Sequence, residues 1–185
     1  GDLAPLHKPG LRERDEAVTK ATMSEIIEGA RHMSTNASKV GQYGYSNVGI
    51  ILLAEVVTRV QPLSFEAFVQ VEILDPLEMH HTWFHTGDID RSLKTTGYFP
   101  NFEPAVDLDL QGYASVGGMY STALDLAQLM GYLQRALNEP EAEDLPINPL
   151  VIHDLTSDYF KDGQRAMGVS VDIGYMDEYS LIRHN

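Results

Sequence analysis

Three polar residues, Tyr45, Ser46 and Asn47, stand where a glycine-containing loop meets a long apolar segment. A tyrosine can act as a general base or acid when cations and hydrogen-bond donors surround it, because an unperturbed phenol with a pKa near ~10 is neutral at physiological pH. Asn47 offers both a donor and an acceptor, which suits holding a substrate amide and a catalytic lysine at once. At a helix start both side chains would lie near one cleft. The residues alone leave a second interpretation open, in which Tyr45 packs on the core and Asn47 caps the helix.

Capping residues and hydrophobic spacing predict the elements around this motif. Thr22-Met23-Ser24-Glu25 fits a capping box at the start of a short helix. The apolar residues from Val48 to Val57 cover several sides of a helix that ends before Pro62, so we expect a buried central helix. The remaining predicted helices run from Ser64 to Asp75, from a cap at Thr122 to about Asn138, and over 150–156 after a cap at Asn148. Small strands are predicted between Lys94 and Met119, and two further strands over 167–173 and 179–182 around a turn at 174–178. An acidic surface loop is predicted over 139–149.

The composition predicts a folded, acidic chain. Its 185 residues, 43% of them hydrophobic and 22% charged, can bury a sizeable core and suit one domain better than two. The 27 acidic and 13 basic residues, with a net charge of -14, argue against nucleic acid and anionic membrane as partners. The absence of cysteine excludes disulfides, cysteine-based zinc sites and a thiol nucleophile, and leaves the redox compartment open. No apolar run approaches the ~18 residues needed to span a bilayer.

Three segments, residues 44–55, 76–82 and 117–126, together resemble the penicillin-recognising serine hydrolases, and most closely the branch of class C-type β-lactamases, D-alanyl-D-alanine carboxypeptidases and related esterases. The run from Gly44 to Glu55 looks like that family's Tyr-x-Asn motif and the helix after it. Residues 76–82 are similar to its Pro-Leu-Gly-Met segment before a threonine, and residues 117–126 resemble its glycine-rich turn into a helix. The matches occur in family order.

The resemblance implies acyl transfer through a serine ester on D-alanyl peptides, β-lactams or small esters. In this family Ser-x-x-Lys supplies the nucleophile and a lysine, Tyr-x-Asn is the second element, and Lys-Thr-Gly or His-x-Gly is the third. Tyr45 and Asn47 match the second element, and Asn47 would also bind substrate. No Ser-x-x-Lys occurs in the chain. Because the family's nucleophile precedes the tyrosine by several tens of residues, we expect it upstream, on the remainder of the same polypeptide.

Two further residues have matches in the family pattern. Residues 181–185 look like the strand that enters the His-x-Gly motif, which would make His184 its histidine. Tyr113 corresponds to a region that lines the substrate pocket, although an ordinary packing role is equally open. His85-Thr86-Gly87 also spells the third motif, but it lies too early in the family order and is treated as surface.

A metal site is not predicted. His80, His81 and His85 lie close in sequence, but consecutive histidines point apart and no His-Glu-x-x-His spacing is present. No cofactor is predicted either. The partner implied by the resemblance is a small-molecule or peptidoglycan-like acyl substrate.

The fold implied by the resemblance is the helical lobe of the β-lactamase/transpeptidase-like α+β fold. We therefore expect a mainly α chain with a few short β-strands, forming a single domain over 1–185 that is a fragment of a larger domain. The lobe would cover roughly 20–160, and 165–185 would begin a sheet that lies mostly outside the chain.

Two functional hypotheses stay open. In the first, the chain is part of a serine hydrolase and is nearly inert alone. In the second, it is a binding module that reuses the lobe without catalysis. Family members with peptidoglycan or antibiotic substrates act outside the cytoplasm, so a periplasmic or extracellular location is expected, with a cytosolic one open for esterase relatives.

Overall fold

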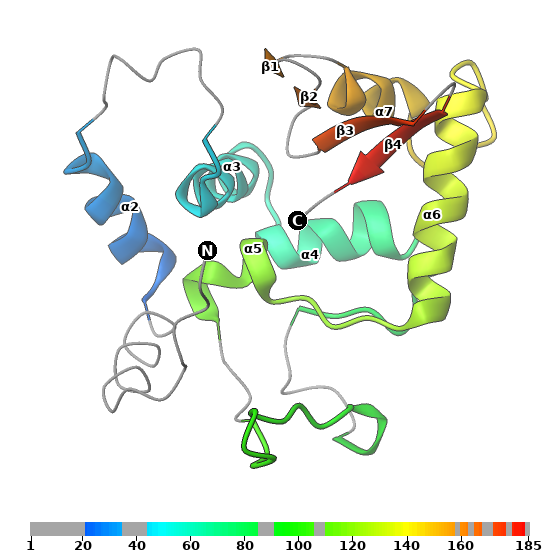
Figure 1. The fold of residues 1–185 in the computed structure, drawn as a ribbon. Helices are drawn as coiled ribbons and strands as arrows, with labels where there is room; N and C mark the ends of the chain where they lie inside the picture. The colour runs from blue at the N-terminus through cyan, green and yellow to red at the C-terminus, as the bar shows by residue number, and fades with distance from the viewer. Residues whose placement is uncertain are drawn as a thin grey trace. The chain divides into compact units, whose positions relative to one another are not determined.

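A computed structural model describes residues 21–34, 44–84, 91–105, 110–157, 160–162, 165–167, 172–176 and 179–183 (Figure 1). The chain forms two compact units. The first contains the described residues up to 34, residues 46–70 and residues 81–121, and the second contains the other described residues. A single domain over 1–185 stays a prediction.

The first unit is built around helix α3. Its elements are α2 (Met23–Arg31), α3 (Asn47–Val60), α4 (Phe65–Val69), the 3₁₀ helices η3 (Arg91–Leu93) and η4 (Gln111–Tyr113), and α5 (Ala114–Gly117). Helices α2, α4 and α5 each contact α3. The π-helix η2 (Gln70–Leu74) continues directly from α4, so the helix predicted from Ser64 is confirmed.

Local caps start these helices as predicted. Glu25 N–H donates to Thr22 Oγ1 at 3.3 Å, and Thr22 N–H donates to Glu25 Oε2 at 2.8 Å, which completes the capping box of α2. Ser64 Oγ accepts from Ala67 N–H at 3.2 Å at the start of α4. Hydroxyl oxygens suit this role because they satisfy backbone donors that have no partner within the helix.

The expectation that α3 is buried on several sides is wrong in this structure. Ile51 and Ala54 are buried, whereas the side chains of Leu53 and Val56 are each 54% exposed and Val60 is 77% exposed. Helix α3 is therefore fully buried at Ile51 and Ala54 and exposed along much of its remaining apolar surface.

The described part of 94–119 is irregular over 94–105 and helical over 111–117. Only two isolated bridges occur near it, Trp83 with Tyr120 and Tyr98 with Pro104. Proline cannot donate to a strand ladder, and the β propensity of aromatic residues depends strongly on their context. The predicted small strands are therefore wrong for the described residues of this range, and residues 106–109 lie outside them.

The second unit pairs two helices and carries a small sheet. Helices α6 (Ala123–Asn138) and α7 (Pro149–Thr156) confirm both predictions, including the caps at Thr122 and Asn148. Tyr132 Oη donates to Ile147 O at 3.4 Å, and Tyr132, Ala136 and Ile152 are buried. The acidic surface loop between the helices is confirmed too, and Asp144 in it accepts from Arg135 Nη2 at 3.1 Å.

The strands form one antiparallel sheet in the order β1-β2-β3-β4. They are β1 (Phe160–Asp162), β2 (Arg165–Met167), β3 (Asp172–Met176) and β4 (Tyr179–Arg183). Met176 pairs with Tyr179 and Ile173 pairs with Ile182. The turn predicted over 174–178 is wrong over its first three residues, because β3 continues through Gly174 to Met176, and residues 177 and 178 lie outside the described residues.

The mainly α fold with a few short β-strands is confirmed. Among the described residues, no single helix has the length and apolarity to cross a membrane, and α3 with the α4–η2 segment passes that test only as a bent pair.

Candidate active site

The motif Tyr45-Ser46-Asn47 forms the entry to α3, and its middle residue is the cap. Ser46 is extended, with φ -146 and ψ 100, and its Oγ accepts from Gly49 N–H at 3.0 Å. Asn47 is the first residue of the helix and its side chain is exposed. Tyr45 is 63% exposed. Because Ser46 takes the capping role, the amide of Asn47 is not used as a cap. The phenol of Tyr45 is not packed in a core, because most of this side chain is exposed.

The alternative interpretation of the motif, with a packed tyrosine and a capping asparagine, is therefore wrong. The catalytic roles of Tyr45 and Asn47 themselves remain predictions. The structure leaves both side chains at the start of a rigid element, where the partial positive charge of a helix N-terminus favours a developing negative charge. This arrangement suits groups that act on a polar substrate from outside the helix.

Tyr113 lies at the junction between η4 and α5, in the same unit as Asn47. Its N–H donates to Leu110 O at 2.7 Å, and its side chain is half-buried. Helix α5, which follows it directly, contacts α3. Both roles predicted for Tyr113 remain open on this geometry. His184 and His85 lie outside the described residues.

Two of the segments that carry the family resemblance meet in space. Thr82 is 1% exposed and its Oγ1 lies 2.9 Å from Ser121 Oγ. The residue after Thr82 pairs with the residue before Ser121. Trp83 N–H donates to Tyr120 O at 2.9 Å, and Tyr120 N–H donates to Trp83 O at 2.6 Å. The threonine after Pro-Leu-x-Met is thus tied to the end of the glycine-rich turn.

Lys94 adds a cation to this junction. Its Nζ donates to Tyr120 Oη at 3.3 Å and lies 4.5 Å from the centroid of the same ring. An ammonium in that position is attracted by the ring face as well as by the hydroxyl. The contact ties residues after η3 to the Trp83–Tyr120 bridge.

The glycine-rich turn needs glycine at only one of its two positions. A Cβ on Gly118 would lie 2.8 Å from Ala114 Cα, whereas a Cβ on Gly117 would meet only Leu110 Cδ1 at an ordinary 3.5 Å. The most demanding glycine is Gly112, where a Cβ would lie 2.6 Å from Met23 N. No local signal marks Gly112, because the crowding comes from a distant part of the chain.

Groups with shifted pKa values lie away from the motif. Hydrogen bonds from the backbone N–H and then the hydroxyl of Thr22 lower the pKa of Glu25. Hydrogen bonds to Glu139 and Asp144 raise the pKa of Arg135, and burial raises the pKa of Tyr132. These shifts belong to helix starts and ends and to helix packing, so none of them marks a catalytic group.

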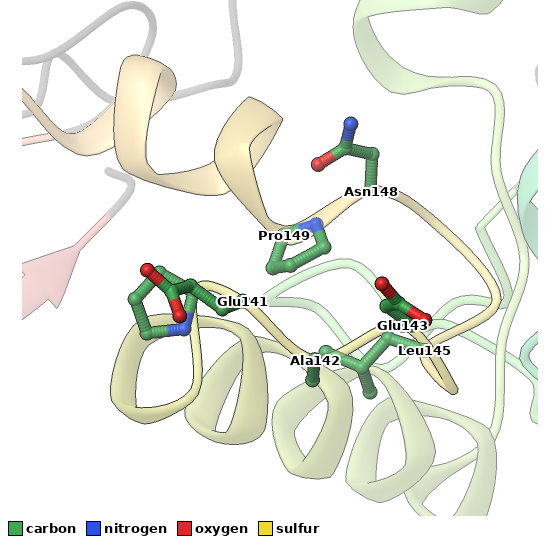
Figure 2. A pocket seen from close by; sticks show the side chains of 7 residues that line it. Glu141, Ala142, Glu143, Leu145, Asn148 and Pro149 are labelled. Atoms are coloured by element: carbon green, nitrogen blue, oxygen red, sulfur yellow. The ribbon is translucent and has the colours of Figure 1, made fainter.

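A hollow of about 410 Å³ lies between the acidic loop and the start of α7 (Figure 2). Figure 2 shows Asn148 and Pro149 on one side and the loop residues Glu141 and Glu143 on the other. Its lining contains no residue of the predicted site. Within the described residues, no three histidine, aspartate or glutamate side chains are grouped closely enough to hold a metal ion.

Comparison with known proteins decides the family. The family model described as Beta-lactamase matches residues 3–177. The chain belongs to the beta-lactamase family. One relative is a human protein named beta-lactamase-like 1, which is 33% identical over 112 residues. Those residues make up 58% of this chain and 22% of that protein. Another is the teichoic acid D-alanine hydrolase of Staphylococcus aureus, 23% identical over 167 residues, 86% of this chain and 40% of that protein.

Solved structures of the family show the same fold. A beta-lactamase/D-alanine carboxypeptidase from Pseudomonas syringae matches with a TM-score of 0.68 at 18% identity, over 94% of this chain and 45% of that one. An octameric penicillin-binding protein homologue from Pyrococcus abyssi matches with a TM-score of 0.63 at 22% identity, over 84% of this chain and 35% of that one. The chain therefore spans less than half the length of each of these relatives. The resemblance read from its motifs is confirmed, as is the helical lobe of the β-lactamase/transpeptidase-like fold.

One departure of this beta-lactamase family member now has a structural meaning. Glu78 stands where the resembling segment of the family has glycine, and its φ is 56. That is the left-handed region, which glycine adopts without strain and glutamate does not. The chain makes this turn with glutamate in a conformation that suits glycine.

Proposed function

We propose that the chain is the helical lobe of a serine hydrolase that acts through an acyl-enzyme, and that Tyr45 and Asn47 are its contribution to the active site. The observation that carries the proposal is the geometry of the motif, in which Ser46 caps α3 and leaves the phenol and the amide exposed beside it. Family membership supplies the reaction class, because its motifs serve acyl transfer to serine.

The proposed reaction has two stages. A serine on polypeptide outside residues 1–185 attacks the acyl carbonyl of the substrate, its proton passes to a base, and the leaving group departs with a proton. Water then cleaves the ester and restores the serine. In this scheme the ionised phenolate of Tyr45 takes up the serine proton and, as the phenol, gives it to the leaving group, while the amide of Asn47 holds the substrate and the partner lysine.

The other predicted residues take supporting places in this scheme. Tyr113 forms part of the pocket wall, and His184 is the histidine of the His-x-Gly element. No metal ion or cofactor enters the scheme, and the 185-residue chain alone is inactive because it has no Ser-x-x-Lys.

The substrate class that we propose is a D-alanyl ester or amide, a β-lactam or a small ester. Two relatives are named for D-alanine chemistry, the teichoic acid D-alanine hydrolase and the beta-lactamase/D-alanine carboxypeptidase. Substrates of that kind belong to the cell envelope, so we place the parent protein in the periplasm or outside the cell.

The test compares single substitutions in the full-length protein. Acylation by a fluorescent penicillin or fluorophosphonate is measured for the wild type, for Tyr45→Phe and for Asn47→Ala. Loss of a general acid or base lowers rates by about 10²-fold or more, and we expect a loss of that size for Tyr45→Phe. Tyr98, which is also 63% exposed, provides the matched control, and Tyr98→Phe should label at the wild-type rate.

An unchanged acylation rate of Tyr45→Phe would show that the Tyr45 hydroxyl takes no part in proton transfer. Absence of labelling in the full-length wild type, together with absence of an upstream Ser-x-x-Lys, would favour the binding module that reuses the lobe without catalysis.

A further inference from the structure

Gly112 lies against the start of α2 with no room for a side chain. A Cβ on Gly112 would lie 2.6 Å from Met23 N and 2.7 Å from Ala21 O, closer than real Cβ atoms come to other atoms. Gly112 is not in the left-handed region, so space and not backbone conformation requires glycine here. The Gly112 N–H also donates to Ala21 O at 3.1 Å. The contact is therefore both tight and directional.

The residues on either side of Gly112 depend on this contact. Gln111 has φ 38, a conformation that costs energy for a residue with a side chain and persists only where surrounding contacts hold it. Tyr113 follows Gly112 directly and leads into α5, which contacts α3. The segment that places Tyr113 is thus held by its own hydrogen bond to Leu110 O and, through Gly112, by residues 21–23.

The start of α2 has a fixed conformation that can hold the segment around Gly112 in place. Thr22 and Glu25 close the capping box on one another, with Thr22 Oγ1 also 2.9 Å from Glu25 Oε2. These bonds fix the first turn of α2, which includes Met23. They thereby fix the backbone around Thr22 against which Gly112 lies. All of these residues belong to the same compact unit as Gly112 and Asn47.

We propose that the capped start of α2 is a positioning element for the substrate pocket, which fixes Gly112 and thereby sets Tyr113 in the pocket wall. The inference rests on the proposed function, in which Tyr113 lines that pocket. Gly112 and Thr22 touch no substrate and act only through Tyr113. A displaced Tyr113 weakens substrate binding, whereas Asn47 keeps its place because the Ser46 cap fixes the start of α3. The effect therefore falls on KM and not on kcat.

The experiment measures kcat and KM of the full-length enzyme with a chromogenic cephalosporin or a small ester. Gly112→Ala should raise KM by roughly tenfold, with kcat within about twofold of the wild type, because a displaced wall residue weakens substrate binding and leaves the reacting groups in place. Gly29→Ala is the matched control, because an added Cβ on this residue of α2 meets nothing within 4 Å. It should leave both constants unchanged.

A double-mutant cycle separates positioning from general damage. If Gly112 acts through Tyr113, the KM of the double variant Gly112→Ala/Tyr113→Ala should equal that of Tyr113→Ala alone. Thr22→Ala adds no bulk and decides the question if Gly112→Ala does not fold. It should raise KM in the same direction, and Thr22→Ser should restore it because the capping hydroxyl returns.

The outcomes are distinct from those of the proposed function. An unchanged KM in folded Gly112→Ala, or additive effects in the cycle, would overturn the positioning role in an enzyme that still turns over substrate. A wild-type enzyme that forms no acyl-enzyme would overturn the proposed function and this inference with it.

Discussion

Replacing Glu78 by glycine should stabilise the chain. Glu78 is exposed and has φ 56, in the left-handed region. A residue with a Cβ gives up roughly 1–2 kcal/mol in that conformation, while glycine costs roughly 0.5–1 kcal/mol because it orders a more flexible chain. The difference predicts a net gain of about 0.5–1 kcal/mol. For a chain of this size that corresponds to a Tm increase of about 1–4 °C.

Thermal and urea unfolding followed by far-UV circular dichroism would measure this gain. Glu78→Ala is the decisive control, since it removes the same negative charge and side-chain length but keeps the Cβ. It should be no more stable than the wild type. The reasoning fails if Glu78→Gly is less stable than the wild type, or if Glu78→Ala gains as much as Glu78→Gly.

Two further predictions concern helix starts. Ser46→Ala should lower the free energy of unfolding by about 1 kcal/mol, because it removes the hydroxyl that accepts from Gly49 N–H at 3.0 Å. Ser46→Asp should retain most of the stability of the wild type, because aspartate also caps helices. Equal urea midpoints for Ser46→Ala and the wild type would contradict the capping role. Hydrogen bonds from Thr22 lower the pKa of Glu25 in the folded chain below its ordinary value of 4.5, so the ionised carboxylate stabilises the fold above that pH and the contribution disappears as the pH falls through the folded pKa. Glu25→Gln should therefore lose stability relative to the wild type at neutral pH and match it in acid, and a difference that does not change with pH would contradict this account.

The helix starts could be predicted from sequence because their determinants are local. Thr22, Thr122 and Asn148 act on backbone groups within three residues of themselves, and all three caps are confirmed. At the motif the same reasoning considered Asn47 as a cap, whereas the structure gives that role to Ser46. Both residue types cap helices well, so sequence alone could not choose between them.

Features set by distant contacts could not be predicted. The requirement for glycine at Gly112 comes from the backbone of residues 21–23, which no local pattern encodes. The aromatic and β-branched residues near Tyr98 suggested strands, but too few partners pair with them to form a ladder. Gly174 suggested a turn, yet pairing with β4 holds it in a strand.

Burial of α3 was also mispredicted from its apolar residues. Apolar coverage on several sides is typical of a helix packed on several sides, and this led to the expectation of a buried central helix. In the structure Ile51 and Ala54 are buried, while Leu53 and Val56 remain exposed. An apolar pattern indicates which surfaces of a helix can be buried. Which of these surfaces are buried depends on the elements that pack against the helix.

Covalent labelling of two forms of the protein tests the central claim most directly. The full-length protein and the chain of 185 residues are exposed in parallel to a fluorescent penicillin and a fluorophosphonate, and the labelled site is located by mass spectrometry. We predict that the full-length form is labelled on a serine of a Ser-x-x-Lys sequence outside residues 1–185, and that the 185-residue chain is not labelled. Covalent labelling of the 185-residue chain would contradict the claim that Tyr45 and Asn47 serve a nucleophile carried elsewhere on the polypeptide.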